Sequence, residues 1–183
     1  MAIELIIGAV VVIGGLWFLL SYNGFVQLKN RIDNAWSQID VQLKRRFDLV
    51  PNLIETVKGY AKHEKETLKM VTEARSAITK AGNLKQKADA ENMLTGALKS
   101  LFAVSESYPT LMANQNFLML QEELAGIESK IAFARQFYND SVLTYNTKTE
   151  SFPDSAVAGI FNFKKREYFE IEEGAREPVK VQF

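Results

Sequence analysis

Apolar residues follow two patterns along this 183-residue chain, and the first is an unbroken run. From Leu5 to Leu20 every residue is apolar or glycine. A bilayer core of about 30 Å takes roughly 20 apolar residues of helix, and inside lipid a helix satisfies its own backbone hydrogen bonds. The run therefore predicts a transmembrane anchor over residues 1–21. Trp17 and Tyr22 stand near its end and are predicted at the membrane interface, because amphipathic rings favour the headgroup level.

The second pattern is a helical repeat that starts directly after the run. From Phe25 to Ala61 the apolar residues recur in steps that average about 3.6 residues, the α-helical period. A helix of that length extends roughly 55–60 Å and can continue straight from the anchor. Pro51 interrupts this series without shifting its phase, which predicts a kink rather than a break.

Three further helices follow from the same kind of spacing. They are predicted at about 64–80, at about 87–107, and from near residue 114 to Phe152-Pro153, the last with an apolar series from Phe117 to Tyr145. Short connections make successive helices antiparallel neighbours. The sequence thus predicts an all-α fold, in which an N-terminal transmembrane helix continues into an elongated antiparallel four-helix bundle with two long and two short helices.

The domain boundaries follow from these elements. We expect the anchor at 1–21, the helical bundle at 22–153 and a C-terminal tail at 154–183, where Phe152-Pro153 ends the last long helix. The tail is predicted to hold a short helix and extended segments. Its strand-like pieces are Tyr168–Ile171 and Val179–Phe183.

The lengths of the helices predict a partner surface near the membrane. Two short helices cover only the membrane-distal part of the long ones, so apolar residues low on the first helix lack a partner within the chain. Apolar patches of that kind usually mark an interaction site, and self-association is the expected solution. An exposed charged pair extends the surface, although a solvated face is the alternative for that pair. The candidate partner surface comprises Phe25, Leu28, Ile32, Trp36, Arg45 and Asp48.

A polar network is predicted inside the bundle. If the first long helix ends near residue 61 and the last begins near 114, Arg46 and Glu128 lie at the same height. We therefore predict that Arg46 pairs with Glu128, with Arg135 nearby and Asn139 on the same polar line of the last helix. Such a network is either a device that sets the register of a bundle or a ligand or catalytic site.

Composition excludes several classes of protein. The chain carries 22 basic and 22 acidic residues, so it lacks the basic excess typical of a nucleic-acid binder. It contains no cysteine, which excludes a lipoprotein anchor and a thiol nucleophile, and it contains a single histidine, His63. We expect no catalytic, cofactor or metal site, because metal sites gather several ligands at helical spacing.

Basic residues indicate the orientation and a second membrane contact. Before the apolar run there is Glu4 but no Lys or Arg, which disfavours a cleaved signal peptide. Lys29 and Arg31 follow the run, so the N-terminus is predicted outside and the C-terminal domain in the cytoplasm. In the tail, the cluster Lys164, Lys165 and Arg166 is predicted at the membrane interface. It either contacts anionic lipid or packs against the base of the bundle.

Several separated motifs, in order along nearly the full length, resemble the LemA family. They are Tyr22-Asn23, Asn34-Ala35-Trp36, Ile39-Asp40-Val41-Gln42-Leu43, Arg45-Arg46, Asp48-Leu49-Val50-Pro51-Asn52-Leu53, Gly59-Tyr60-Ala61, His63-Glu64, Tyr108-Pro109, Glu128, Ile131-Ala132, Ala134-Arg135, Tyr138-Asn139, Tyr145-Asn146 and Phe152-Pro153. The resemblance implies a bacterial inner-membrane protein with one N-terminal span, a cytoplasmic helical bundle and no established enzymatic activity. It also implies a link to envelope stress and an integral-membrane zinc metalloprotease as a partner.

These observations lead to one main hypothesis and two alternatives. The main hypothesis is a membrane-tethered, self-associating interaction or scaffold protein in envelope stress or membrane-protein quality control. The first alternative is a module that binds lipid surfaces through its C-terminal tail. The second is an enzyme that uses the cluster of Arg46, Glu128 and Arg135.

Overall fold

The computed structural model describes residues 1–61 and 63–169, and all the regular structure in this part of the chain is helical. The helices are α1 (Ala2–Tyr60), α2 (Lys65–Lys80), α3 (Leu84–Ser105), α4 (Pro109–Met112), α5 (Gln115–Glu150) and α6 (Asp154–Ile160). The predicted all-α fold, with two long helices and two shorter ones, is confirmed. Of the predicted strand-like pieces, Tyr168 and Phe169 lie outside regular structure, and residues 170–183 fall outside the described part.

The first helix runs without a break from the apolar run into the body of the protein. It passes through Pro51, which lies inside α1 and not at an end. Proline removes one backbone hydrogen bond from a helix, and the apolar stripe on both sides of Pro51 keeps the same phase and buries the same face. The prediction that α1 continues beyond Pro51 is therefore correct.

The chain forms two compact units. The N-terminal unit comprises Met1–Ser37 and Gln136–Tyr168. The bundle unit comprises Gln38–Arg135 and, among the later described residues, Phe169. Each unit takes one part of α1 and one part of α5.

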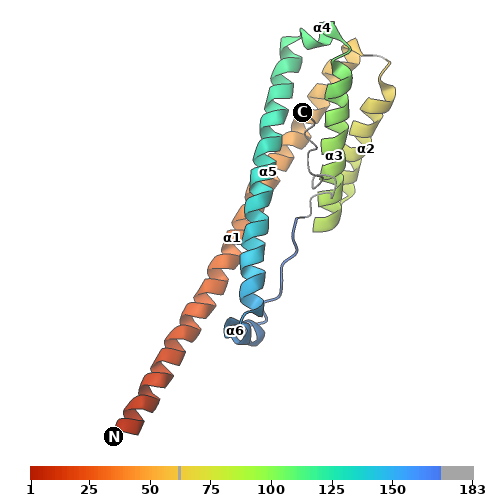
Figure 1. The fold of residues 1–183 in the computed structure, drawn as a ribbon. Helices are drawn as coiled ribbons and strands as arrows, with labels where there is room; N and C mark the ends of the chain where they lie inside the picture. Colours follow the sequence, from red (N-terminus) through yellow and green to blue (C-terminus); the bar gives the residue numbers. More distant parts are fainter. Residues whose placement is uncertain (62, 170–183) are drawn as a thin grey trace, which may run out of the picture. The chain divides into compact units, whose positions relative to one another are not determined.

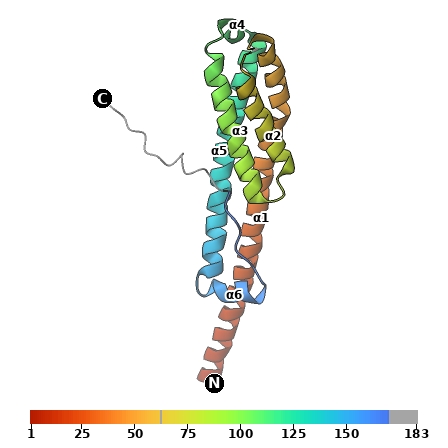
Figure 2. The same cartoon turned by 90° about the vertical axis from the view of Figure 1, so that its right-hand side faces the viewer.

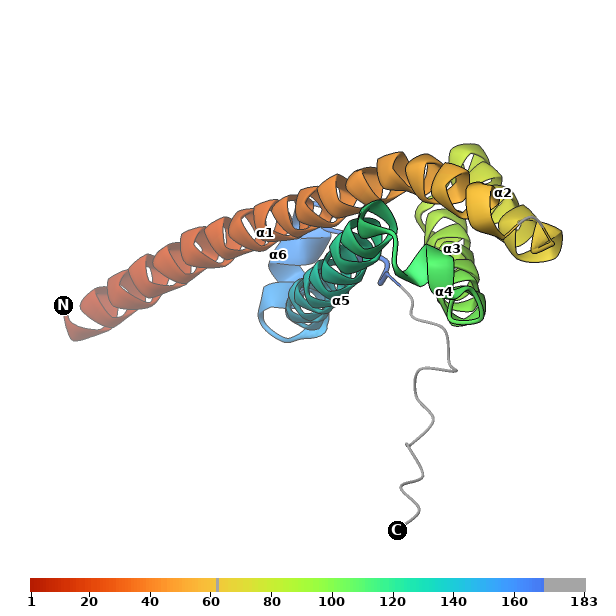
Figure 3. The same cartoon turned by 90° about the horizontal axis from the view of Figure 1, so that it is seen from above.

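The bundle unit is a four-helix bundle. Residues 38–60 of α1 and 115–135 of α5 pack with α2 and α3 (Figures 1 and 2), and Figure 3 shows α4 between α3 and α5 at one end. An apolar cluster from all five helices fills its interior and contains Val50, Leu53, Ile54, Val57, Ala61, Val71, Ala74, Leu94, Ala97, Leu98, Leu101, Leu111, Phe117 and Leu124. Burial of this apolar surface is the main stabilising contribution to the unit.

Turn chemistry sets where the shorter helices begin. Asn83 caps α3, because its side chain accepts a hydrogen bond from the backbone N–H of Gln86 at 2.8 Å. The Gln86 side chain in turn accepts from the backbone N–H of Gly82 at 2.9 Å. Pro109 occupies the start of α4, where its missing N–H costs nothing. Pro109 thus begins a separate short helix after α3.

In the N-terminal unit, the last part of α5 and the segment after it pack on α1. Figure 2 shows α6 and the chain that follows it beside α1 and α5. The contacts are largely aromatic. Phe163 stacks on Phe25 with ring centroids 4.8 Å apart, Tyr145 meets Phe25 edge-on at 6.0 Å, and Tyr138 meets Trp36 at 6.0 Å.

Candidate functional site: a buried charge network and its surroundings

Arg46 is the most deeply buried charged residue of the bundle unit. Its side chain is 0 % exposed, because position 46 follows Leu43 by three residues and precedes Val50 by four, on the buried face of α1. Its Nη1 donates to a carboxylate oxygen of Glu128 and to Thr95 Oγ1 at 2.8 Å. Its Nη2 donates to the carboxylate of Glu91 and to the backbone oxygen of Glu91 at 3.2 Å.

The two carboxylates that bind Arg46 lie in different environments. The side chain of Glu91, on α3, is 1 % exposed, whereas that of Glu128, on α5, is 37 % exposed. Thr95 stands between them, with its hydroxyl oxygen 3.2 Å from Glu128 Oε1 and 3.1 Å from the backbone oxygen of Glu91. The hydroxyl has one proton, so it donates to one of these oxygens at a time.

Arg135 adds a second cation to the same interior. It is 6 % exposed, donates from Nη1 to Asn92 Oδ1 at 3.0 Å, and lies over the ring of Phe169, 4.6 Å from its centroid. Within the described residues, its Nε and Nη2 are buried without a hydrogen-bond partner. Cation–π contact and the nearby carboxylates therefore balance part of its desolvation.

Burial disfavours the charged forms of Glu91 and Arg135, whereas the opposite charges around each of them favour the charged form. Burial raises the pKa of Glu91, while the attraction of Arg46 and, more weakly, of Arg135 and Lys87 opposes that rise. Burial and then the like charge of Arg46 lower the pKa of Arg135, while Glu128 and Glu91 oppose this. Two guanidinium groups and two carboxylates make an electrically balanced set, which is what an interior tolerates.

The network agrees with the prediction in its main pair and differs in its membership. The Arg46–Glu128 ion pair is present, and Arg135 lies close enough for its charge to act on Glu91. Asn139 lies one helical turn beyond Arg135 and belongs to the N-terminal unit. Glu91 was missed, although the sequence carried a signal for it. It stands three residues from both Ala88 and Leu94, so it is an acidic residue on the buried face of α3.

The chemistry available to this network is structural. Both carboxylates are held by Arg46, and no group of three or more metal-ligating side chains occurs among the described residues. Its geometry matches a buried polar set that specifies how helices align. Two open grooves adjoin it. One of about 240 Å³ is lined in part by Glu91 and Phe47, and one of about 250 Å³ by Thr95, Glu128 and Phe102.

The predicted partner surface on α1 is wrong for its apolar members. Phe25 is 0 % and Ile32 is 2 % exposed, and Leu28 and Trp36 are half-buried. The prediction counted only the short helices as cover for α1. In the structure the last part of α5 and the chain after α6 cover this stretch, with Tyr145, Phe163 and Tyr138 as the contacting rings.

The charged members of that surface differ from each other. Arg45 binds Glu123 within the bundle unit, with its Nη2 2.7 Å and its Nε 3.1 Å from Glu123 Oε1, and its side chain is 55 % exposed. Asp48 is exposed. The Arg45–Glu123 contact is thus a surface ion pair, and such a pair contributes about 0–1 kcal/mol to the free energy of unfolding.

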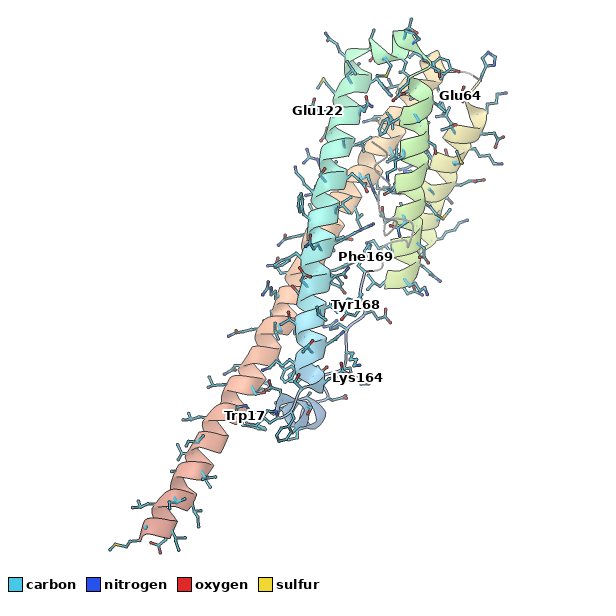
Figure 4. All side chains as sticks on the ribbon, viewed as in Figure 1. Trp17, Glu64, Glu122, Lys164, Tyr168 and Phe169 are labelled. Carbon is cyan, nitrogen blue, oxygen red and sulfur yellow. The ribbon has the colours of Figure 1, made fainter. Side chains whose placement is uncertain are left out.

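The residues predicted at the membrane interface lie within the N-terminal unit. Figure 4 shows Trp17 on α1 and Lys164 at a similar height in this unit. The Tyr22 ring lies 4.6 Å from that of Phe161. Lys165 binds Glu150 at 2.6 Å, and Arg166 reaches Asp33 at 3.5 Å, so two of the three tail cations pair with acidic side chains of their own unit. Lys164 is exposed.

Comparison with known proteins bears on the whole of this architecture. Residues 35–183, which include the charge network, the later part of α1 and all of α5, match the LemA family. The chain belongs to the LemA family. The resemblance inferred from its separated motifs is thereby confirmed.

Relatives of this LemA-family protein include named magnetosome proteins. It is 27 % identical to magnetosome protein MamQ 1 of Paramagnetospirillum magneticum and 26 % identical to MamQ of Magnetospirillum gryphiswaldense, in each case over 88 % of this chain and 69 % of the relative. It is also 30 % identical to protein LemA of Metamycoplasma hominis, over 74 % of this chain and 63 % of the relative.

The N-terminal helix of this LemA-family protein is long and apolar enough to cross a membrane. Its most apolar window has a mean hydropathy of 2.5, and none of that window is buried in the protein. A core helix would bury such a surface, whereas a bilayer solvates it. The helix fits a membrane-anchored protein.

Proposed function

We propose that this LemA-family protein is a membrane-tethered interaction protein, without enzymatic activity, that associates with further copies of itself through the outer face of α5. This outer face consists of the exposed residues of α5 in the bundle unit. They are Gln115, Asn116, Leu118, Met119, Glu122, Ala125, Gly126, Ser129, Lys130, Ala132 and Phe133.

The observation that supports this proposal is the low charge of the face. Glu122 and Lys130 are its only charged residues, while Met119 is 68 % and Phe133 is 74 % exposed. Figure 4 marks Glu122 on this helix. The exposed residues of α2, in the same unit, are mostly charged or polar and include five charged side chains, at 65, 66, 69, 73 and 80. An exposed apolar helix face of this kind is typical of an interaction surface.

The small residues of the face favour a second helix as the occupant. Ala125, Gly126, Ser129 and Ala132 stand at consecutive turns, where short side chains let two helix backbones approach closely. A second copy of this chain suits the face, because α1 confines every copy to the same membrane and orientation. This restriction removes part of the entropic cost of association.

Disulfide crosslinking of the full-length protein in its membrane tests the proposal. The chain contains no cysteine, so a single introduced thiol reports one position only. With a mild oxidant, Phe133→Cys should form a disulfide-linked dimer. The matched control is Met70→Cys on α2, where the native residue is 43 % exposed, and it should stay monomeric. Equal crosslinking at both positions would contradict the proposed surface.

A second variant separates association from folding. A side chain added at Gly126 meets no atom within 4 Å, so Gly126→Arg leaves the bundle intact. It should lower the fraction of oligomer at least tenfold by mass photometry in lipid nanodiscs, with an unchanged melting temperature. A protein that is monomeric at every density before any substitution overturns the proposal.

The cellular setting is a further part of the proposal, and the family resemblance supports it. We place the protein in a bacterial inner membrane with the N-terminus outside, in envelope stress or membrane-protein quality control beside an integral-membrane zinc metalloprotease. The orientation is tested by labelling. Met70→Cys should react with a membrane-impermeant maleimide only after the cells are opened.

The proposed partner is tested by co-purification. A membrane metalloprotease that co-purifies with the full-length protein, but not with the Gly126→Arg variant, would bind through the same face.

A further inference from the structure

The short helix α6 is fastened to α1 where the apolar run ends. The hydroxyl of Ser21 donates to the carboxylate of Asp154, the first residue of α6. Lys148 binds the other carboxylate oxygen of Asp154 at 3.1 Å. Ser21 directly follows Leu20, the last residue of the run, so α6 begins at the boundary of the predicted span.

Aromatic packing holds the other end of α6 at the same height. The ring of Phe161 lies 5.8 Å from that of Phe18 and 4.6 Å from that of Tyr22. Residues 18–22 of a helix span about 6 Å along its axis, which is comparable to the depth of the headgroup and acyl boundary. If α1 spans a bilayer as far as the end of the apolar run, α6 lies at the level of that boundary.

At this height α6 and its flanks expose large apolar side chains. Phe152, just before α6, is 89 % exposed, Ile160 at its end is 68 % exposed, and Phe161 is 44 % exposed. The inner side of α6 packs against the protein, because Val157 and Ala158 are buried and Asp154 forms an ion pair with Lys148. The apolar residues thus face away from the protein at the level where lipid begins.

We propose that α6 is a second membrane contact, in which Phe152 and Ile160 insert into the interfacial layer of the same bilayer that α1 spans. The contact is driven by apolar burial, and the exposed Lys164 nearby adds a weaker attraction to anionic lipid. It would fix the tilt and rotation of the N-terminal unit, since one helix alone leaves both free. This inference does not depend on self-association.

Site-directed fluorescence on the full-length protein in vesicles tests the proposal. The single-cysteine variants Phe152→Cys and Ile160→Cys carry an environment-sensitive dye. The matched control is Leu143→Cys, because Leu143 is 55 % exposed in the same unit and lies about 10 Å from the end of α5. In vesicles of phosphatidylcholine alone, dyes at 152 and 160 should shift to the blue. They should be quenched several-fold more by a shallow lipid-attached nitroxide than the dye at 143.

Two results would overturn the proposal. One is equal quenching at 143, 152 and 160. The other is a shift that appears only when phosphatidylglycerol is added, because the contact would then be electrostatic and not apolar. As an independent measurement, the double variant Phe152→Ser with Ile160→Ser should speed amide hydrogen exchange in residues 154–163 several-fold in vesicles. Unchanged exchange would contradict the insertion of these side chains.

Discussion

At the residue scale, Arg46 joins three helices, because it stands on α1 and binds carboxylates of α3 and α5. Its partner Glu91 is the more deeply buried carboxylate. A buried ion pair is replaced by apolar residues at little cost, but the loss of one member leaves an uncompensated buried charge. The network therefore contributes more to the choice of helix alignment than to net stability.

Substitution of Glu91 tests this asymmetry. Glu91→Ala should lower the free energy of unfolding by about 3–5 kcal/mol, because Arg46 stays buried with one partner fewer. Asp89→Ala, an exposed position two residues away on α3, should cost less than about 0.5 kcal/mol. Denaturant unfolding in detergent, followed by circular dichroism, measures both. A similar loss for the two variants would show that Glu91 does not anchor the network.

The pH dependence of stability carries a separate signature of Glu91. Its folded-state pKa is raised from the ordinary 4.5 by burial, so above pH 4.5 the unfolded chain releases this proton first. The native state then binds more protons, and the free energy of unfolding falls as the pH rises from 4.5 to the folded-state pKa. Glu91→Gln should lack this decline, whereas Asp89→Asn should keep it. Parallel pH profiles for wild type and Glu91→Gln would contradict the raised pKa.

At the element scale, local signals set the boundaries of the helices more firmly than long-range contacts do. The start of α3 depends on a reciprocal pair, in which Asn83 caps the helix and Gln86 binds back to Gly82. Both interactions can be read from the order Gly82-Asn83 and a glutamine three residues later. By contrast, the continuation of α1 through Pro51 depends on the apolar face that the bundle buries.

The cap of α3 provides an element-scale prediction. Asn83→Ala should lower the free energy of unfolding by about 1 kcal/mol, because the N–H of Gln86 loses its acceptor. Asn83→Ser should restore most of this stability, since a hydroxyl oxygen also caps. Thermal melts of the full-length protein distinguish the two. Equal melting temperatures for both variants would show that the cap contributes nothing.

At the scale of the whole molecule, α1 serves two environments with one continuous helix. Its first part exposes apolar residues on every side, and its later part buries one face against other helices. The same exposed residue type therefore has different consequences in the two parts. Val11 is 68 % and Val41 is 62 % exposed, yet only Val11 stands in the predicted span.

Charge placed on these two valines tests the anchor. Val11→Arg should weaken membrane insertion, because arginine near the centre of a span costs about 2.5–3.5 kcal/mol. Val41→Arg is the matched control on the same helix and should leave the protein in the membrane. The fraction that resists carbonate extraction measures the difference. Full retention of Val11→Arg would contradict a span at this position.

The sequence accounts for much of the site because its signals are local. The period of the apolar residues placed Arg46 and Glu128 on facing sides of two helices, and counting from the helix ends gave their common height. Glu91 was not predicted as a member of the network, because only the apolar residues of α3 were used to define its buried face. The burial of Phe25 was not predicted, because the rings that cover it belong to Tyr145 and Phe163, which are distant in sequence.

The sequence by itself determined the helices, the apolar anchor and the family of this protein. The helical period, the caps and the unbroken apolar run depend on residues that are close in sequence, so they can be predicted from the sequence directly. Only the tertiary structure decided which apolar residues are covered and which are free. That outcome depends on how α5, α6 and the segment after α6 fold back onto α1, which is a matter of distant contacts. It buried Phe25 and Ile32, and it left Phe152, Ile160 and the outer face of α5 exposed, which is the basis of both proposals.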